Sequence, residues 1–89
     1  MSMTLAQIRA FESIVRLGSF QAAARELGLT QPSVSQRIRE LESALGTALF
    51  IRHGPRVSLT TEGDALVDHA RRLLDDTASV VARFRERDP

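Results

Sequence analysis

The apolar residues of this chain recur with a helical period from its beginning. A first helix is predicted by residues that return at steps of three and four and share one inward face: Leu5, Ile8, Phe11 and Val15. Thr4 followed by Gln7 has the spacing of a capping box, so we expect this helix to begin at Leu5. Gly18 marks its end.

Two further helices follow almost without a break. Ser19 suits the N-cap of a short second helix, and Gly28 ends that helix in a left-handed conformation. Its inward residues are Phe20, Ala23, Ala24 and Leu27. Thr30 caps the third helix, Pro32 is tolerated in its first turn, and Gly46 terminates it. At about 100° per residue its apolar stripe is narrow and comprises Val34, Ile38, Leu41 and Leu45.

The second half of the chain begins with a hairpin pattern. The segment ALFIRHGPRVSLT predicts two short strands around a turn at His53, Gly54 and Pro55. Its apolar members are Leu49, Phe50, Val57 and Leu59. Thr60 or Thr61 then caps a long final helix that reaches about Arg87. Acidic residues in the first turn of this helix and arginines in its last turn complement the helix dipole.

Together these elements predict a mainly α fold, a winged helix-turn-helix made of three helices and a two-stranded wing. A long linker or dimerisation helix follows it. The corresponding division is a DNA-binding unit at 1–60 and a linker helix at 61–89. Eighty-nine residues suffice for one small core.

Composition narrows the function further. Apolar residues make up 43% and charged residues 26% of the chain, as in globular proteins, and no apolar run is long enough to span a membrane. The absence of cysteine excludes disulfides and thiolate zinc sites and is compatible with the cytoplasm. His53 and His69 have neither a third ligand nor a neighbouring nucleophile. We therefore predict no enzymatic activity, no metal and no cofactor.

The charge is distributed unevenly. Residues 1–60 carry seven arginines and four glutamates, whereas residues 61–89 carry five arginines and seven acidic residues. All twelve basic residues are arginine, whose planar fork suits phosphates and guanine edges. A genomic preference for arginine and alanine codons is the alternative explanation, and we favour it slightly as the cause of this choice.

The exposed side of the third helix is unusual for a surface helix. Opposite the apolar stripe it presents Pro32, Ser35, Gln36, Arg39 and Ser43. Such short, hydrogen-bonding side chains fit a major groove about 12 Å wide, and serine and glutamine can bond base edges. Ordinary solvated surface is the alternative interpretation of this face.

Several motifs in the same segment carry a family resemblance. The patterns AAA-x-x-L, Q-x-x-V-S-x-x-I-x-x-L-E, LG-x-x-LF-x-R and LT-x-x-G occur in order in SFQAAARELGLTQPSVSQRIRELESALGTALFIR and the later LTTEG. This chain thereby resembles, over nearly its whole length, the N-terminal DNA-binding segment of LysR-type transcriptional regulators.

The resemblance implies a homodimer on an inverted-repeat operator in double-stranded DNA, with the third helix in the major groove and the wing on the backbone or minor groove. Carried over by position, the base-contacting places fall on Gln31, Pro32, Ser35 and Gln36, and the basic wing places on Arg52 and Arg56. Position 36 is often arginine in the family, so that guanine preference does not transfer here. The second arginine of the wing, Arg56, also lies one position later than in the commonest pattern of the family.

Other residues complete the candidate DNA-binding set. Ser33 and Arg39 share the third helix, and helix starts place Ser19, Gln21 and Thr30 where backbone N–H groups can meet phosphate. Capping alone explains Ser19 and Thr30 equally well. The wing arginines could instead pair with acidic residues at the start of the last helix, Glu62 and Asp64.

The last helix carries a second apolar stripe that continues past the part its own body can cover. The stripe comprises Leu66, Ala70, Leu73, Thr77, Val80 and Phe84, with Val67, Leu74 and Val81 beside it. An exposed stripe of this kind marks a partner surface, so we expect the helix to pair with its copy. A frayed tail is the alternative.

Full-length members of the family continue into an effector-binding domain, and we expect this sequence to be part of such a protein. Any small-molecule effector would then act through that missing domain. The alternative function is a winged helix used as a protein–protein interaction or dimerisation module. That use favours an apolar or acidic third-helix face, whereas the face here is neutral to basic.

Overall fold

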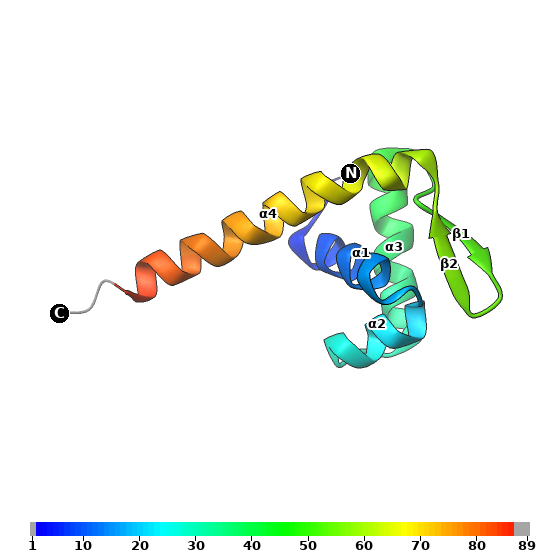
Figure 1. Ribbon diagram of the computed structural model, residues 1–89, viewed down its shortest axis with the longest axis horizontal. Coiled ribbons are helices and arrows are strands. Elements are labelled where there is room, and N and C mark those ends of the chain that lie inside the picture. The colour runs from blue at the N-terminus through cyan, green and yellow to red at the C-terminus, as the bar shows by residue number, and fades with distance from the viewer. Residues whose placement is uncertain (1, 87–89) are drawn as a thin grey trace.

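The elements follow one another in the predicted order within residues 2–86, which a computed structural model describes. They are α1 (Leu5–Leu17), α2 (Phe20–Leu27), α3 (Gln31–Leu45), β1 (Phe50–His53), β2 (Arg56–Leu59) and α4 (Thr61–Arg85). The three short helices and the hairpin form one body, and α4 projects from it (Figure 1). The predicted winged helix-turn-helix with a long final helix is confirmed.

Each helix begins at the predicted N-cap. A hydroxyl oxygen at the cap accepts a hydrogen bond from the backbone N–H three residues on, which satisfies one of the free donors at a helix start. The four caps are Thr4, Ser19, Thr30 and Thr60. Thr4 and Gln7 also form the complete capping box. Local chemistry therefore fixes where the helices start.

The core lies where α1 meets α2, α3 and α4, and β1 closes one side of it. Its buried apolar residues come mainly from α1, α2 and α3: Ile8, Ala10, Phe11, Ile14, Phe20, Ala23, Ala24, Val34, Ile38 and Leu41. The ring of Phe50 on β1 lies 5.3 Å from that of Phe11 and 5.7 Å from that of Phe20, centroid to centroid. These aromatic contacts join the wing to the helical body.

The prediction that Leu5 and Leu45 point into the core is wrong. The side chains of Leu5 and Leu45 are 42% and 41% exposed, although both lie on the correct helical stripe. Leu5 is in the first turn of α1 and Leu45 in the last turn of α3. The inner face of α1 instead includes Ala10 and Ile14, which the predicted stripe omits.

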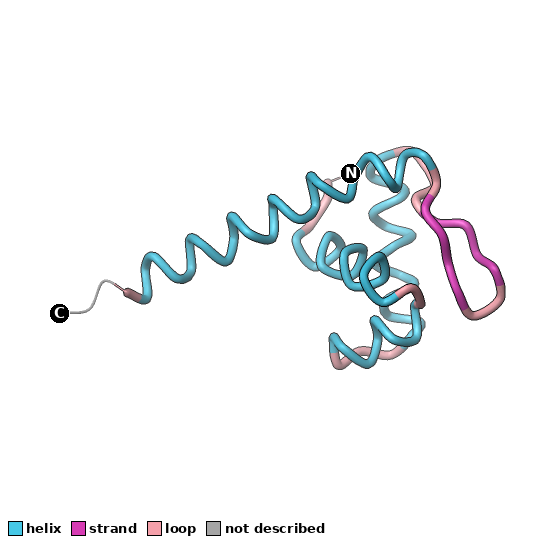
Figure 2. The backbone as a smooth tube through the Cα atoms, in the orientation of Figure 1, coloured by secondary structure: helices cyan, strands magenta, loops and turns pink. Residues whose placement is uncertain are grey.

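The wing is a two-stranded antiparallel hairpin with a tighter turn than predicted (Figure 2). His53 is the last residue of β1 and pairs with Arg56, so the turn consists of Gly54 and Pro55 alone. Nε2 of His53 lies 2.9 Å from Oγ of Ser58 on the neighbouring strand. Gly54 has φ +62°, which permits this two-residue connection.

The LT-x-x-G motif builds the junction between the wing and α4. Oγ1 of Thr60 accepts from the Gly63 N–H at 2.9 Å and donates to the Ala48 carbonyl at 2.7 Å. The N–H of Thr60 donates to the Leu49 carbonyl at 3.1 Å. A Cβ added at Gly63 would lie 2.1 Å from that same carbonyl oxygen. The first turn of α4 therefore packs directly on the backbone before β1.

Beyond Leu74, α4 leaves the body and accounts for much of the long dimension of a molecule measuring 52 × 25 × 21 Å (Figure 1). The helix ends at Arg85; the expected end near Arg87 lies outside the described residues. Ala70, expected in the dimerisation stripe, is fully buried in the core of its own chain. That part of the prediction is wrong, because the first half of α4 contacts α1 and buries this residue in the core of its own chain.

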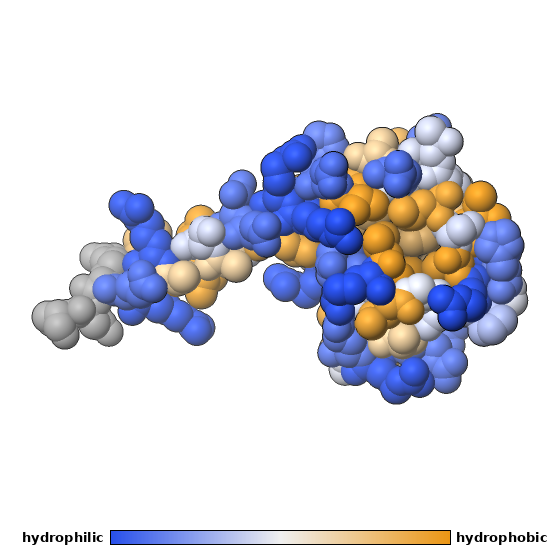
Figure 3. All heavy atoms as spheres, in the orientation of Figure 1, coloured by the Kyte–Doolittle hydropathy of each residue, from blue (hydrophilic) through white to orange (hydrophobic). Residues whose placement is uncertain are grey.

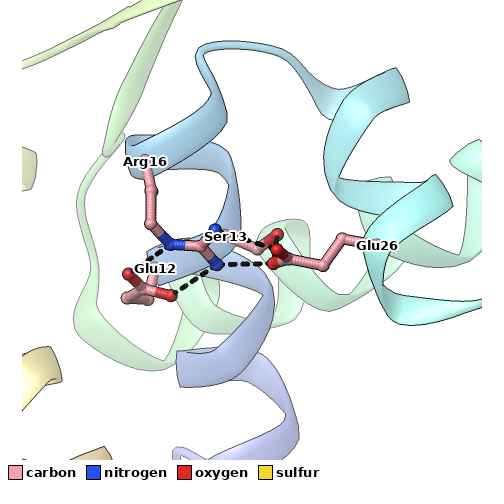
Figure 4. Close-up of polar contacts among 4 residues, drawn as sticks. All are labelled: Glu12, Ser13, Arg16 and Glu26. Atoms are coloured by element: carbon pink, nitrogen blue, oxygen red, sulfur yellow. Dashed lines mark hydrogen bonds and ion pairs between the residues drawn. The ribbon is translucent and has the colours of Figure 1, made fainter.

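An ion-pair network fastens α2 to α1. The guanidinium of Arg16 lies between the carboxylates of Glu12 and Glu26, and Glu26 also accepts from the Ser13 hydroxyl at 2.6 Å (Figure 4). The hydrogen bonds from Arg16 and then Ser13 lower the pKa of Glu26 to about 2. The two carboxylates raise the pKa of Arg16. Arg16 thus connects two helices.

Acid should weaken this connection in a defined pH range. The folded state holds the pKa of Glu26 below its ordinary value of 4.5, so the ionised carboxylate stabilises the fold above that pH. This contribution disappears as the pH falls from about 4.5 towards 2. We expect urea midpoints to drop over that range and the drop to be smaller in Glu26→Gln.

Glu40→Gln is the matched control, since the Glu40 carboxylate contacts the amide of Gln36 rather than an arginine. It should leave the acid profile unchanged. Equal profiles for the wild type and Glu26→Gln would show that the Arg16 network contributes no pH-dependent stability.

Candidate nucleic-acid interface

The polar face of α3 is presented to solvent beside the wing. In Figure 1 the wing runs alongside α3, and its tip lies towards the end of the body where α3 begins. On this side of α3, Gln31, Pro32, Ser33, Gln36 and Arg39 are exposed, and Ser35 is partly exposed. The predicted α3 site residues therefore share one accessible surface.

Surface hydrogen bonds hold several of these side chains. Nη2 of Arg39 donates to Oε1 of Gln36 at 2.7 Å, and Nε2 of Gln36 donates to Glu40 at 3.1 Å. Glu40 is not among the predicted site residues, although it lies one helical turn after Gln36, which was the available signal. All three side chains are exposed, so exchanging these bonds for bonds to a base costs little.

The candidate residues at helix starts act as caps. Oγ of Ser19 accepts from the Ala22 N–H at 2.9 Å, and Thr30 accepts from the N–H of Ser33 while donating to its hydroxyl. Gln21 is exposed in the first turn of α2. Capping thus accounts for the geometry of Ser19 and Thr30, and a phosphate contact from this edge stays a prediction.

The two wing arginines turn back towards the body. The Arg52 guanidinium carbon lies 4.0 Å from the centroid of the Phe20 ring, and Nη2 of Arg52 is 3.5 Å from Oγ of Ser35. A Cβ at Gly18 would meet Nη2 of Arg56 at 3.2 Å, so this second guanidinium lies beside the turn between α1 and α2. Their partners are therefore not Glu62 and Asp64.

These contacts tether the wing to the start of α2. The Val57 N–H donates to the Gly18 carbonyl at 3.3 Å, adding a backbone bond to the arginine and aromatic contacts. Sequence reasoning missed Gly18 and Phe20 as wing partners, because nothing local in the chain links them to residues more than 30 positions away. A hollow of about 240 Å³ remains between α3 and β1, with Ser35, Arg39 and Arg52 in its lining.

Residues 2–86 contain neither a metal-binding cluster nor a helix that could span a membrane. In that range no three histidine, cysteine, aspartate or glutamate side chains gather where they could hold a metal ion. No described helix combines the length and the apolar content that crossing a membrane requires.

Residues 5–64 match the sequence model of the bacterial regulatory helix-turn-helix proteins of the LysR family. The chain belongs to the LysR family. The match spans α1 to the first turn of α4 and includes all the motifs that carried the resemblance.

Relatives and solved structures agree with this assignment. The HTH-type transcriptional regulator CfxR of Cupriavidus necator is 45% identical over 75 residues, covering 84% of this chain and 24% of that protein. The crystal structure of the CbnR_DBD–DNA complex superposes with a TM-score of 0.87 at 31% identity, covering 93% of this chain and 95% of that one. The BenM_DBD complex with catB site 1 DNA gives 0.88 at 34% identity, covering 93% and 92%.

The chain spans about a quarter of the length of the LysR-type regulators whose sequences it matches. It corresponds instead to nearly the whole of the DNA-binding domains solved with DNA. This segment is therefore a LysR-type helix-turn-helix DNA-binding domain.

Proposed function

We propose that the domain binds an inverted-repeat operator in double-stranded DNA sequence-specifically, as a homodimer and as part of a cytoplasmic transcriptional regulator. The observation that carries this proposal is the exposed face of α3, where Gln31, Ser35, Gln36 and Arg39 lie together beside the wing. The division into a DNA-binding unit at 1–60 and a linker helix at 61–89 belongs to the same proposal.

In the proposed complex α3 enters the major groove. The side opposite its buried stripe carries hydroxyl, amide and guanidinium groups, which bond base edges and phosphates. Pro32 in the first turn brings the helix start close to the duplex without a long side chain. The wing lies against the adjoining backbone or minor groove, to which Arg52 and Arg56 contribute positive charge.

A dimer is supported by the apolar surface of α4. Val80 and Val81 are 56% and 45% exposed on the part of the helix that has left the body. Apolar side chains also reach the surface along this projection in Figure 3. A surface groove of about 390 Å³ continues the stripe towards the body, with Met3, Leu45 and Leu73 in its lining. With Ala70 buried, the proposed dimer surface comprises Leu66, Leu73, Leu74, Thr77, Val80, Val81 and Phe84.

Base reading by α3 can be tested by replacing two side chains, one at a time, with alanine. After sites have been selected from random DNA, we expect Ser35→Ala or Gln36→Ala to relax the preference at one symmetric pair of operator positions. The expected loss is about 1–3 kcal/mol of discrimination, the usual contribution of a good base contact. Fluorescence anisotropy on duplexes with single base-pair changes measures it.

Ser43→Ala is the control, because Ser43 is exposed on the same side of α3 but lies two turns further along. It should retain the wild-type preference. Unchanged preference at every position in both test variants, with melting curves showing them folded, would remove Ser35 and Gln36 from base readout.

The competing function is a module that binds or dimerises with protein. Affinity for DNA that falls steeply with salt distinguishes the two, because neutralised phosphates release counterions. We expect a pronounced salt dependence of the apparent Kd for the intact chain. No measurable retention on DNA at low salt would favour the protein-binding module.

A further inference from the structure

Arg52 lies in the hollow between the wing and α3 because of the register of the hairpin. It pairs with Val57, one position before the end of β1. Side chains two apart on a strand share a face, so Arg52 lies on the same side as Phe50, whose ring packs on Phe11 and Phe20. The strand therefore directs the guanidinium towards the helical body.

Two contacts fix the guanidinium there. It stacks over the Phe20 ring at 4.0 Å, and its Nη2 donates to Oγ of Ser35 at 3.5 Å. Arginine suits this place because its plane stacks on an aromatic face while an edge N–H still donates. Arg39 and Glu42 also line the hollow, but Arg39 bonds Gln36 and the Glu42 carboxylate accepts from the Leu49 N–H.

The contact with Arg52 restricts what the Ser35 hydroxyl can do. A hydroxyl has one hydrogen to donate and two lone pairs, whereas a guanidinium has only donors. The Arg52 bond therefore occupies a lone pair of Ser35 and repels the hydroxyl hydrogen from that side. Ser35 keeps its hydrogen and one lone pair on the side away from Arg52. Because accepting from a cation polarises the O–H bond, donation by this hydroxyl is strengthened relative to a second acceptance.

We propose that Arg52 is a positioning residue that presents Ser35 to DNA as a hydrogen-bond donor. At the position that Ser35 faces, the domain then selects a base with a major-groove acceptor, namely guanine, adenine or thymine, over cytosine with its amino group. This inference rests on the proposed function, and it assigns to a wing residue a sequence preference that is exerted through α3.

The test compares Arg52→Lys, Arg52→Ala, Ser35→Ala and the double variant Ser35→Ala with Arg52→Ala. Affinities are measured for four duplexes that differ only at the base pair whose preference Ser35→Ala loses. We expect the wild type to disfavour cytosine roughly 5- to 150-fold, and each variant to reduce this ratio to about 2-fold or less. The double variant should lose no more discrimination than either single variant.

Arg52→Lys separates positioning from charge. Lysine keeps the positive charge and the salt dependence of binding but loses the planar stack on Phe20. We expect it to keep the wild-type salt slope while losing discrimination against cytosine. Arg9→Ala, which removes one charge from an exposed position on α1, should leave the discrimination intact. Melting curves confirm that each variant is folded at the assay temperature.

Two outcomes would overturn the inference alone. One is full discrimination in Arg52→Lys, which would mean that charge suffices. The other is a uniform loss of affinity for all four duplexes in Arg52→Ala, which would make Arg52 a phosphate contact only. A wild type without preference at any operator position would instead overturn the proposed function, and the inference with it.

Discussion

Replacing Gly63 with alanine should destabilise the domain by at least about 3 kcal/mol, the upper end of the usual cost of overpacking. The added Cβ would lie 2.1 Å from the Leu49 carbonyl oxygen and 3.0 Å from both the Leu49 carbonyl carbon and Cδ2 of Leu59. Backbone atoms cannot rotate away as a flexible side chain can. To relieve the overlap, the first turn of α4 must lift from the segment before β1.

That movement would also disturb the Thr60 cap, which bonds the carbonyl of Ala48 and the N–H of Gly63. For a domain of this size we expect the melting temperature to fall by more than about 12 °C. Thermal unfolding followed by circular dichroism measures the effect.

Gly46→Ala is the matched control. Gly46 has φ +72°, but a Cβ there meets no atom within 4 Å, so only the conformational cost of about 1 kcal/mol should appear. If Gly63→Ala were as stable as Gly46→Ala, the junction between α4 and the wing would be looser than its contacts indicate.

Placing glutamates at Leu73 and Val80 should convert the domain to monomers and weaken operator binding about 100-fold or more. A dimer binds the second half-site intramolecularly, which raises avidity by roughly 10²–10⁴. Leu73 lines the groove beside Met3 and Leu45, and Val80 is 56% exposed further along the same stripe. Burying two carboxylates between paired helices would oppose association. Sedimentation and binding to paired and single half-sites measure the two effects.

The same number of charges on the other side of α4 provides the control. Ser79→Glu with Ala82→Glu changes two exposed positions outside the apolar stripe and should leave the dimer intact. A wild type that sediments as a monomer at high concentration, and binds DNA as a monomer, would contradict the pairing of α4.

Sequence alone predicted those features that depend on neighbouring residues. A hydroxyl side chain three residues before a free N–H defines a helix start, and a glycine with positive φ defines an end. The first, at Thr4, and the last, at Thr60, are both caps of this kind. The element order and the polar face of α3 follow from the same local periodicity.

Features that depend on distant segments were not predictable in this way. A helical stripe contains both Leu45 and Ile38, but only the arrangement of α1 and α4 decides which of them is covered. The same arrangement buries Ala70, which the heptad-like spacing had placed at a dimer surface. The sequence identified Arg52 as a basic residue of the wing. Its stack on the Phe20 ring could not be predicted, because that contact depends on the register of β1 and the angle of α2.

The bond from Val57 to the carbonyl of Gly18 and the stacking of Arg52 on Phe20 hold the wing to the helical body that carries α3. We therefore expect the wing and α3 to meet DNA as one rigid template. Such a template cannot adjust its span to the duplex it meets. Any mismatch in groove width must be absorbed by bending or twisting of the DNA, and the energy of that deformation depends on base sequence. Base pairs between the two contacted grooves would then influence affinity without touching a side chain.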